Sequence, residues 1–333
     1  MADIPNITVS RCGHSELDEL VNFAKRMHKK GNRLPSQDKN TILQKYREYR
    51  ESNLLNLFIV KDERKIIGCS GYIPFKALFK NKKVEGIVGS DIVIDPEYSR
   101  NFRSLPALLF RNYRKFIMED KSFCINFPIS EAIAQSFKAA QWKNFSYVDV
   151  FSNSLTIDIL PAISGSSIEI KHVSYFDKDM KVFFKTISGQ HQFILNADAD
   201  FLNWKYFKSP YADYVVFIAT KKNKIVGYVV AQNRKLIIEI VDLVINIDYP
   251  VVMPLLVYKL FNFMAQERIV KATCYLGHKT YIDIARKIGF FYNRTYECLF
   301  FKLSSLFSAI GPSDIAKSDN RLYHFNGFTN YLY

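Results

Sequence analysis

A short basic segment follows the fourth strand expected from the sequence, and its residue types could bind phosphate. The segment comprises Tyr98, Ser99, Arg100, Asn101, Phe102, Arg103 and Ser104. A helix is expected to begin just after it, and such a helix directs unpaired backbone N–H groups and its positive dipole end toward the preceding loop. This arrangement suits a pyrophosphate, and the two guanidinium groups could contact it as well. The segment is our candidate phosphate cradle.

Histidines and aromatic residues elsewhere could act in chemistry or in packing. His28 and His191 carry imidazoles that titrate near neutrality and could serve as bases, with a structural role as the alternative for each. Trp204 and Tyr206 could stack on a nucleobase or sugar ring, although their helical setting also suits core packing. The five cysteines are scattered and form no Cys-x-x-Cys pair, which argues against a disulfide framework and a zinc site. No metal is indicated.

The elements that would position these residues follow one order twice. In the first half we expect β-α-α-β-β-β-α-β-α-β-β, because apolar residues alternate in the strands and recur every three to four residues in the helices. The expected segments are a strand from residue 7, a helix from Ser15, a helix over 38–50, strands over 56–60, 65–79 and 84–94, a helix over 105–119, a strand over 123–127, a helix over 130–139 and a hairpin over 145–157. In the second half they are a strand over 168–170, helices over 176–185 and 199–206, strands over 214–220, 225–231 and 236–245, a helix over 251–266, a strand over 270–275, a helix ending at 287 and strands through 301.

Local sequence similarity indicates that this order is a duplication. Lys65-Ile66-Ile67-Gly68 recurs 159 residues later as Lys224-Ile225-Val226-Gly227, and Leu108-Leu109 recurs 147 residues later as Leu255-Leu256. A period this long indicates duplicated domains and not a solenoid. We expect domains at 1–160 and 161–303, and a polar tail rich in terminal aromatic residues at 304–333.

Composition limits the possible locations and partners. With 48% hydrophobic and 23% charged residues the chain is expected to be globular, and no apolar stretch is long enough to span a membrane. The first residues lack the pattern of a signal peptide, so a cytoplasmic location is expected. The formal net charge of +14 favours anionic partners such as nucleic acid, anionic lipid or phosphorylated small molecules, or else it marks only a solvated basic surface.

Several motifs then carry a resemblance to a known superfamily. Ile94-Asp95-Pro96-Glu97-Tyr98 ends the fourth expected strand, Phe127-Pro128 ends the next, and Ala285-Arg286-Lys287-Ile288-Gly289-Phe290 ends a helix of the second copy. With this element order the chain resembles the GNAT acyltransferase superfamily over most of residues 5–303, as a tandem member. The resemblance implies an α/β (α+β) fold of two GNAT-like domains, each a mixed central sheet flanked by helices.

The resemblance also implies a site for acyl-CoA as co-substrate in the first copy. The backbone of Val93 and Ile94 would contact the thioester oxygen at a strand bulge, the candidate phosphate cradle would hold the pyrophosphate, and Phe127 would lie nearby. The family usually has glycines in this loop, and this chain has none, so a degenerate domain that no longer binds CoA is an alternative. The matching loop of the second copy, residues 246–250, has neither glycine nor a basic side chain, which favours acyl-CoA binding by the first copy.

The reaction that the resemblance implies is direct attack of an amine on a thioester, which needs a base for the ammonium proton. Asp91 on the fourth expected strand is the first candidate for this base, and His28 is the second. The helix tyrosine that many family members use is replaced by Phe137 and Ala285. Arg33, His191, Trp204 and Tyr206 are the candidate substrate-binding residues.

Within the resemblance, a tandem chain with a degenerate loop looks most like bacterial sugar N-acyltransferases. We expect transfer of an acetyl or short hydroxyacyl group, such as 3-hydroxybutanoyl, to the amino group of a dTDP-linked aminodeoxy sugar, for surface polysaccharides such as O-antigen or capsule. The alternatives are an aminoacyl- or peptide-directed transferase and a catalytically dead binding module.

Overall fold

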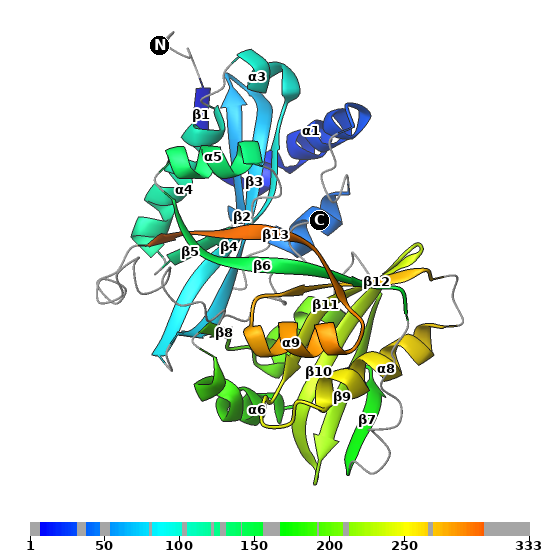
Figure 1. Ribbon diagram of the computed structural model, residues 1–333. Helices are drawn as coiled ribbons and strands as arrows, with labels where there is room; N and C mark the ends of the chain where they lie inside the picture. Colours follow the sequence, from blue (N-terminus) through cyan, green and yellow to red (C-terminus); the bar gives the residue numbers. More distant parts are fainter. Residues whose placement is uncertain are drawn as a thin grey trace.

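The computed structural model describes most of the chain, and its strands form one continuous mixed sheet. The described residues are 7–31, 38–46, 54–79, 82–101, 105–120, 123–126, 131–140, 142–155, 167–191, 193–208, 213–265 and 269–302. The sheet has 13 strands in the order β1-β2-β3-β4-β5-β13-β6-β12-β11-β10-β9-β7, and β8 pairs with β3 beside this path. Helices cover both faces (Figure 1), so the expected α/β class is confirmed.

The first half contains most of the elements that the sequence predicts. They are β1 (Ile7–Gly13), η1 (His14–Glu16), α1 (Leu17–Lys29), α2 (Lys39–Tyr46), β2 (Leu54–Asp62), β3 (Lys65–Phe79), β4 (Lys82–Ile94), α3 (Pro96–Asn101), α4 (Leu105–Asp120), β5 (Phe123–Asn126), α5 (Glu131–Ala139) and β6 (Lys143–Asn153). The hairpin expected over 145–157 is wrong, because β6 is a single strand whose two edges pair with two different strands.

The second half repeats the order with small differences. Its elements are β7 (Ile168–Val173), α6 (Met180–Ile187), η2 (Ser188–Gln190), β8 (Phe193–Leu195), α7 (Ala199–Leu202), η3 (Asn203–Phe207), β9 (Tyr214–Lys221), β10 (Lys224–Arg234), β11 (Ile237–Ile245), α8 (Val252–Met264), β12 (Lys271–Leu276), α9 (Lys279–Lys287) and β13 (Phe291–Lys302). The helix expected over 199–206 is a short α-helix that continues as the π-helical turn η3. The short strand β8 was not expected.

The two halves exchange their last strands. β6 ends the first half, yet it pairs with β12 and with β13, and β13 in turn pairs with β5. In Figure 1 these two strands cross the middle of the molecule between the upper and the lower half. The domain boundary at residue 160 lies outside the described residues and stays a prediction. In space, however, the last described strand joins the first half.

A second connection runs through β3, which extends into the second half. Its end pairs antiparallel with β8, from Ala77 opposite Leu195 to Phe79 opposite Phe193. One core cluster contains apolar side chains of both halves, among them Phe75 and Phe176. The halves therefore share a core as well as a sheet.

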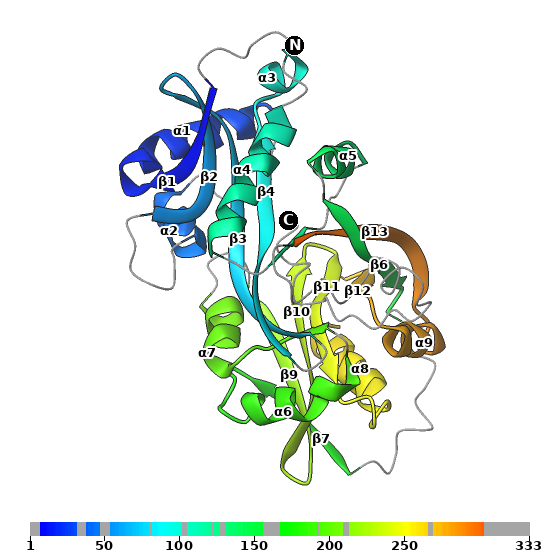
Figure 2. The same ribbon diagram turned by 90° about the vertical axis from the view of Figure 1, so that its left-hand side faces the viewer.

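In the first half, helices sandwich the sheet. Strand side chains point alternately to the two faces. Leu57 and Ile59 of β2 pack in the cluster of α1 and α2, while Phe58 and Val60 pack in the cluster of α4 and α5. The two pairs of helices lie on opposite sides of the sheet in Figure 2. Among the described residues no helix is long and apolar enough to cross a membrane.

Candidate functional site

The candidate base Asp91 lies at a bulge of β4. Cys69 of β3 is opposite Val93 and Gly71 is opposite Ser90, so one residue of β3 faces two residues of β4. Asp91 has a φ of 49°, a left-handed conformation that is unusual for a residue with a side chain. Strained backbone of this kind is maintained only where the surrounding structure holds it, and it is frequent at functional sites.

The side chain of Asp91 is buried against α2, where it forms an ion pair with Lys45. The side chains of Asp91 and Lys45 are 5% and 9% exposed. Burial raises the pKa of Asp91, and the Lys45 ammonium opposes that shift. An acid whose pKa is raised by burial and which contacts a cation is a candidate for proton transfer.

Tyr46 and Ser90 lie around this pair. The Ser90 hydroxyl is 3.3 Å from Asp91 Oδ2. The Tyr46 ring packs directly over Gly71, where an added Cβ would be 2.1 Å from Tyr46 Cε1. The Tyr46 hydroxyl is buried and has no hydrogen-bond partner among the described residues. A polar atom without a partner beside a strained acid marks this face of β4 as the candidate reactive centre.

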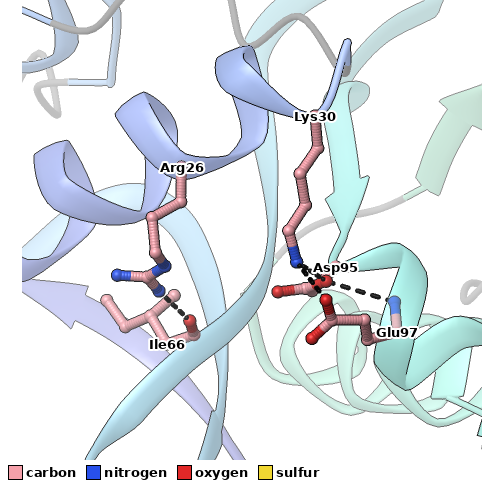
Figure 3. A network of polar contacts seen from close by, with 5 residues as sticks. All are labelled: Arg26, Lys30, Ile66, Asp95 and Glu97. Carbon is pink, nitrogen blue, oxygen red and sulfur yellow. Dashed lines mark hydrogen bonds and ion pairs between the residues drawn. The ribbon is translucent and has the colours of Figure 1, made fainter.

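A polar network next to this centre fastens the end of α1 to the end of β4 (Figure 3). Lys30 Nζ lies 2.9 Å from Asp95 Oδ1 and 3.0 Å from Glu97 Oε1, and Arg26 donates to the carbonyl of Ile66 at 2.9 Å. Although burial raises the pKa of Asp95, the hydrogen bonds from Lys30 and from the Glu97 N–H hold it below its ordinary value. The C-terminal end of α1 is therefore anchored beside the first turn of α3.

The candidate phosphate cradle is partly helical. Tyr98, Ser99, Arg100 and Asn101 belong to α3, whereas Phe102, Arg103 and Ser104 lie outside the described residues. The Tyr98 hydroxyl donates to Asp62 at 2.7 Å, and this bond, with burial, raises the pKa of Tyr98 to about 12. Tyr98 thus points toward the turn between β2 and β3. Helix α4 still begins right after the segment, as the cradle requires.

The matching loop of the second half has its backbone donors already occupied. Gln190 Oε1 accepts from the Ile247 N–H at 3.0 Å, and Asn246 accepts from the N–H groups of Asp248 and Tyr249 at 2.9 Å each. Asp248 adds a negative charge. A pyrophosphate would have to displace these bonds and approach that charge, so this loop is poorly suited to bind one.

The end of strand β11 in the second half also has its backbone groups bonded to a side chain. The Tyr281 hydroxyl lies 2.8 Å from the Ile245 nitrogen and 3.1 Å from its carbonyl oxygen. Ile245 stands opposite Gly227 as Ile94 stands opposite Gly68. The backbone group that matches Ile94 is therefore engaged by a side chain within the second half.

The other candidate residues are dispersed. Val93 shares the α1–α2 face with Asp91, whereas Ile94 packs toward α4 and α5. His28 is exposed on α1, and Arg33 and Phe127 lie outside the described residues. All of them stay predictions.

The remaining candidates belong to the second half. His191 is buried 4.9 Å from the ring of His278, and Trp204 is half-buried beside Phe201. The Tyr206 hydroxyl donates to the buried Asp242 at 2.8 Å. Among the described residues no three histidine, cysteine or acidic side chains form a group that could hold a metal.

Sequence reasoning missed Lys45, Asp242 and Tyr281. A signal for Lys45 was present, because Lys45-Tyr46 recurs as Lys205-Tyr206 160 residues later, close to the offset of the Lys65 motif. Tyr281 was missed because it lies one helical turn before Ala285, the position compared with the family tyrosine.

Comparison with solved structures places this architecture among known folds. The chain is similar to a GCN5-related N-acetyltransferase from Anabaena variabilis, with a TM-score of 0.64 and 14% identity over 90% of this chain and 73% of that one. It is also similar to Saccharomyces cerevisiae N-myristoyltransferase with bound myristoyl-CoA, with a TM-score of 0.61 and 9% identity over 91% of this chain and 80% of that one. A tandem GNAT protein from the clavulanic acid biosynthesis pathway gives a TM-score of 0.57 and 8% identity over 89% of this chain and 98% of that one.

At these identities the similarity establishes the fold alone. No protein-family profile matches the sequence. A search of curated proteins finds no match either. The chain has the fold of the GNAT acetyltransferases, in a tandem arrangement, which confirms the expected architecture.

Proposed function

We propose that the protein is an acyl-CoA-dependent N-acyltransferase whose reactive centre lies in the first half. The observation that carries this proposal is the buried acid Asp91 at the bulge of β4, in a fold shared with N-acetyltransferases. The acceptor amine attacks the thioester carbonyl carbon, the C–S bond breaks, and Asp91 receives the proton that the ammonium loses. The thiolate of CoA leaves and takes up a proton from solvent.

The asymmetry between the halves supports one acyl-CoA site per chain. In the second half the donors at Ile245 and Ile247 are bonded to Tyr281 and Gln190, and Asp248 repels phosphate. The first half has the basic cradle ahead of α4, where Arg100 and Arg103 supply positive charge. We assign acyl-CoA binding to the first half and acceptor binding or support to the second.

Isothermal titration with acetyl-CoA and with myristoyl-CoA tests the donor site. We expect one bound acyl-CoA per chain, and a Kd raised about tenfold or more when both Arg100 and Arg103 are replaced by alanine, because charge-assisted contacts to phosphate are lost. Lys222→Ala, which removes an exposed lysine from the turn between β9 and β10, is the charge control and should leave the Kd unchanged. If neither acyl-CoA binds, the protein is a binding module of another kind.

For the acceptor we propose a nucleotide-linked amino sugar, with a dTDP-aminodeoxyhexose as the leading candidate. The net charge of +14 suits two polyanionic substrates. A turnover assay that releases free CoA, run with dTDP- and UDP-amino sugars, polyamines and peptides, would identify the acceptor class. Turnover of a peptide or polyamine with no turnover of any amino sugar would reject this substrate while leaving the acyltransferase proposal intact.

A further inference from the structure

The pair formed by Lys45 and Asp91 has a counterpart in the second half. Gly68 stands opposite Ile94 and Gly227 opposite Ile245, so Asp91 and Asp242 each lie three residues before matching positions. Lys205 is the counterpart of Lys45, since Lys45-Tyr46 recurs as Lys205-Tyr206 and η3 has the place of α2 in the second half. Both lysines lie over the ring of the next residue, at 5.4 Å from Tyr46 and 4.7 Å from Tyr206. The duplication has thus preserved an acid, a lysine and a tyrosine in each half.

The two acids differ in the groups that hold them. Asp242 accepts from Tyr206 at 2.8 Å and from Tyr228 at 2.9 Å. The residue of β3 that matches Tyr228 is Cys69, which is fully buried and has a thiol in place of the phenol. Asp242 is therefore fixed by two phenols. Asp91 instead contacts an ammonium.

We propose that Lys45 is the positioning residue for Asp91 in acyl transfer, a role that rests on the proposed function. A carboxyl group buried without a cation would stay protonated at neutral pH and could not accept a proton from the amine. The Lys45 ammonium stabilises the carboxylate form inside the protein and fixes its place at the bulge. The acid thereby stays buried, with a raised affinity for protons, and still reaches the basic form that the reaction requires.

The other groups that face Asp91 do not substitute for Lys45. On β3 the Cys69 thiol lies close enough to Lys45 to feel its charge, yet it is neutral, because burial raises its pKa. Ser90 of β4 and Tyr46 of α2 are uncharged. Among the described residues that act on the pKa of Asp91, Lys45 is the cation.

Carbon-13 NMR of the aspartate carboxyl groups tests this role without any substrate. Asp91→Asn assigns the resonance. We expect the pKa of Asp91 to rise further in Lys45→Met and to return toward its wild-type value in Lys45→Arg, which keeps the charge. If Lys45→Met does not fold, Lys45→Gln is the neutral variant to titrate. A folded neutral variant in which Asp91 titrates as in the wild type would overturn the proposal.

A kinetic experiment tests the same role, with Lys205, the matching lysine of the second half, as its control. With acetyl-CoA and any acceptor that the turnover assay identifies, Lys45→Met should lower kcat at neutral pH at least about tenfold and move the acidic limb of the pH profile upward. Lys45→Arg should restore most of the rate. Lys205→Met should change the melting temperature while leaving kcat and the pH profile as in the wild type. Equal effects of the two methionine variants would mean that Lys45 is only structural.

The two measurements separate this inference from the proposed function. If wild-type protein binds no acyl-CoA, the proposed function fails whatever the NMR titration gives. If acyl-CoA binds and an amine is acylated while Asp91 titrates independently of Lys45, the acyltransferase stands and the positioning role falls.

Discussion

Two tyrosines at matching positions of the repeat have different partners. Tyr206 donates to Asp242, a buried acid that also accepts from Tyr228. Tyr46 is equally buried, yet its hydroxyl has no partner among the described residues. The difference arises next to Gly71, which lacks a side chain where the second half has Val230, so the ring of Tyr46 lies over the strand.

Removal of the two hydroxyls should therefore have unequal effects on stability. Tyr206→Phe leaves a buried carboxylate with one donor fewer, and we expect the free energy of unfolding to fall by about 2 kcal/mol. Tyr46→Phe removes a hydroxyl that has no bond to lose, so a change within about 0.5 kcal/mol, or a small gain, is expected. Urea denaturation of both variants measures this. A loss in Tyr46→Phe as large as that in Tyr206→Phe would show that the Tyr46 hydroxyl is bonded.

At this scale the sequence allowed the strand of Asp91 to be predicted, but not its surroundings. Alternation of apolar residues places Asp91 on β4, and the resemblance implied a bulge near it, whereas the contact of Asp91 with α2 depends on how that helix packs. Lys45 contacts an acid 46 positions along the chain, on another element. No local pattern reports such a contact, although the repeat of Lys45-Tyr46 offered an indirect signal.

Helix α3 shows how one acid organises the junction between two elements. Pro96 occupies the first helical position, where the missing N–H costs nothing, and Asp95 Oδ1 accepts from the Glu97 N–H at 3.1 Å. The same oxygen binds Lys30 at the end of α1. Asp95 and Pro96 carry the sequence signals of a helix start. The sequence analysis instead expected a loop between the fourth strand and the helix that begins near residue 105.

Asp95 should stabilise the protein in a pH-dependent way. Its pKa in the folded protein is held below the ordinary 3.8, so its contribution is present above that value and is lost as the pH falls through the folded pKa. We expect Asp95→Ala to lower the free energy of unfolding at neutral pH by about 1–2 kcal/mol, since a helix cap is lost. Thermal melts across pH should show the gap to wild type narrowing in acid.

Glu97 provides the matched control for this experiment. It also pairs with Lys30, but its side chain is 63% exposed, and exposed ion pairs contribute little. Glu97→Gln should leave stability nearly unchanged at every pH. If the difference in stability between Asp95→Ala and the wild type persisted in acid, the charge of Asp95 would not be what stabilises the junction.

The whole molecule is where sequence reasoning failed most. Element types and the duplication could be predicted, because each strand and helix carries its own periodicity. The exchange of β6 and β13 could not, since the sequence of each strand is compatible with a strand whichever neighbours it pairs with. Two separate sheets therefore satisfy the local patterns as well as the continuous one does.

The exchange predicts that neither half folds alone. In a fragment of residues 1–160, β6 would lose both of its neighbours, β12 and β13, and in a fragment of residues 161–333, β13 would lose both β5 and β6. Each fragment would also expose its part of the core cluster shared around Phe75 and Phe176. Unpaired strand edges and exposed apolar surface favour aggregation over folding.

Expression of the fragments separately and together tests this prediction. Alone, each should give no cooperative thermal transition by circular dichroism. Co-expressed, they should elute as one complex on size-exclusion chromatography and unfold in a single transition, because pairing of β6 with β12 and of β13 with β5 restores the sheet. A cooperative transition in the isolated 1–160 fragment would show that the first half can complete its sheet without β13. The acyl-CoA site could then be studied apart from the second half.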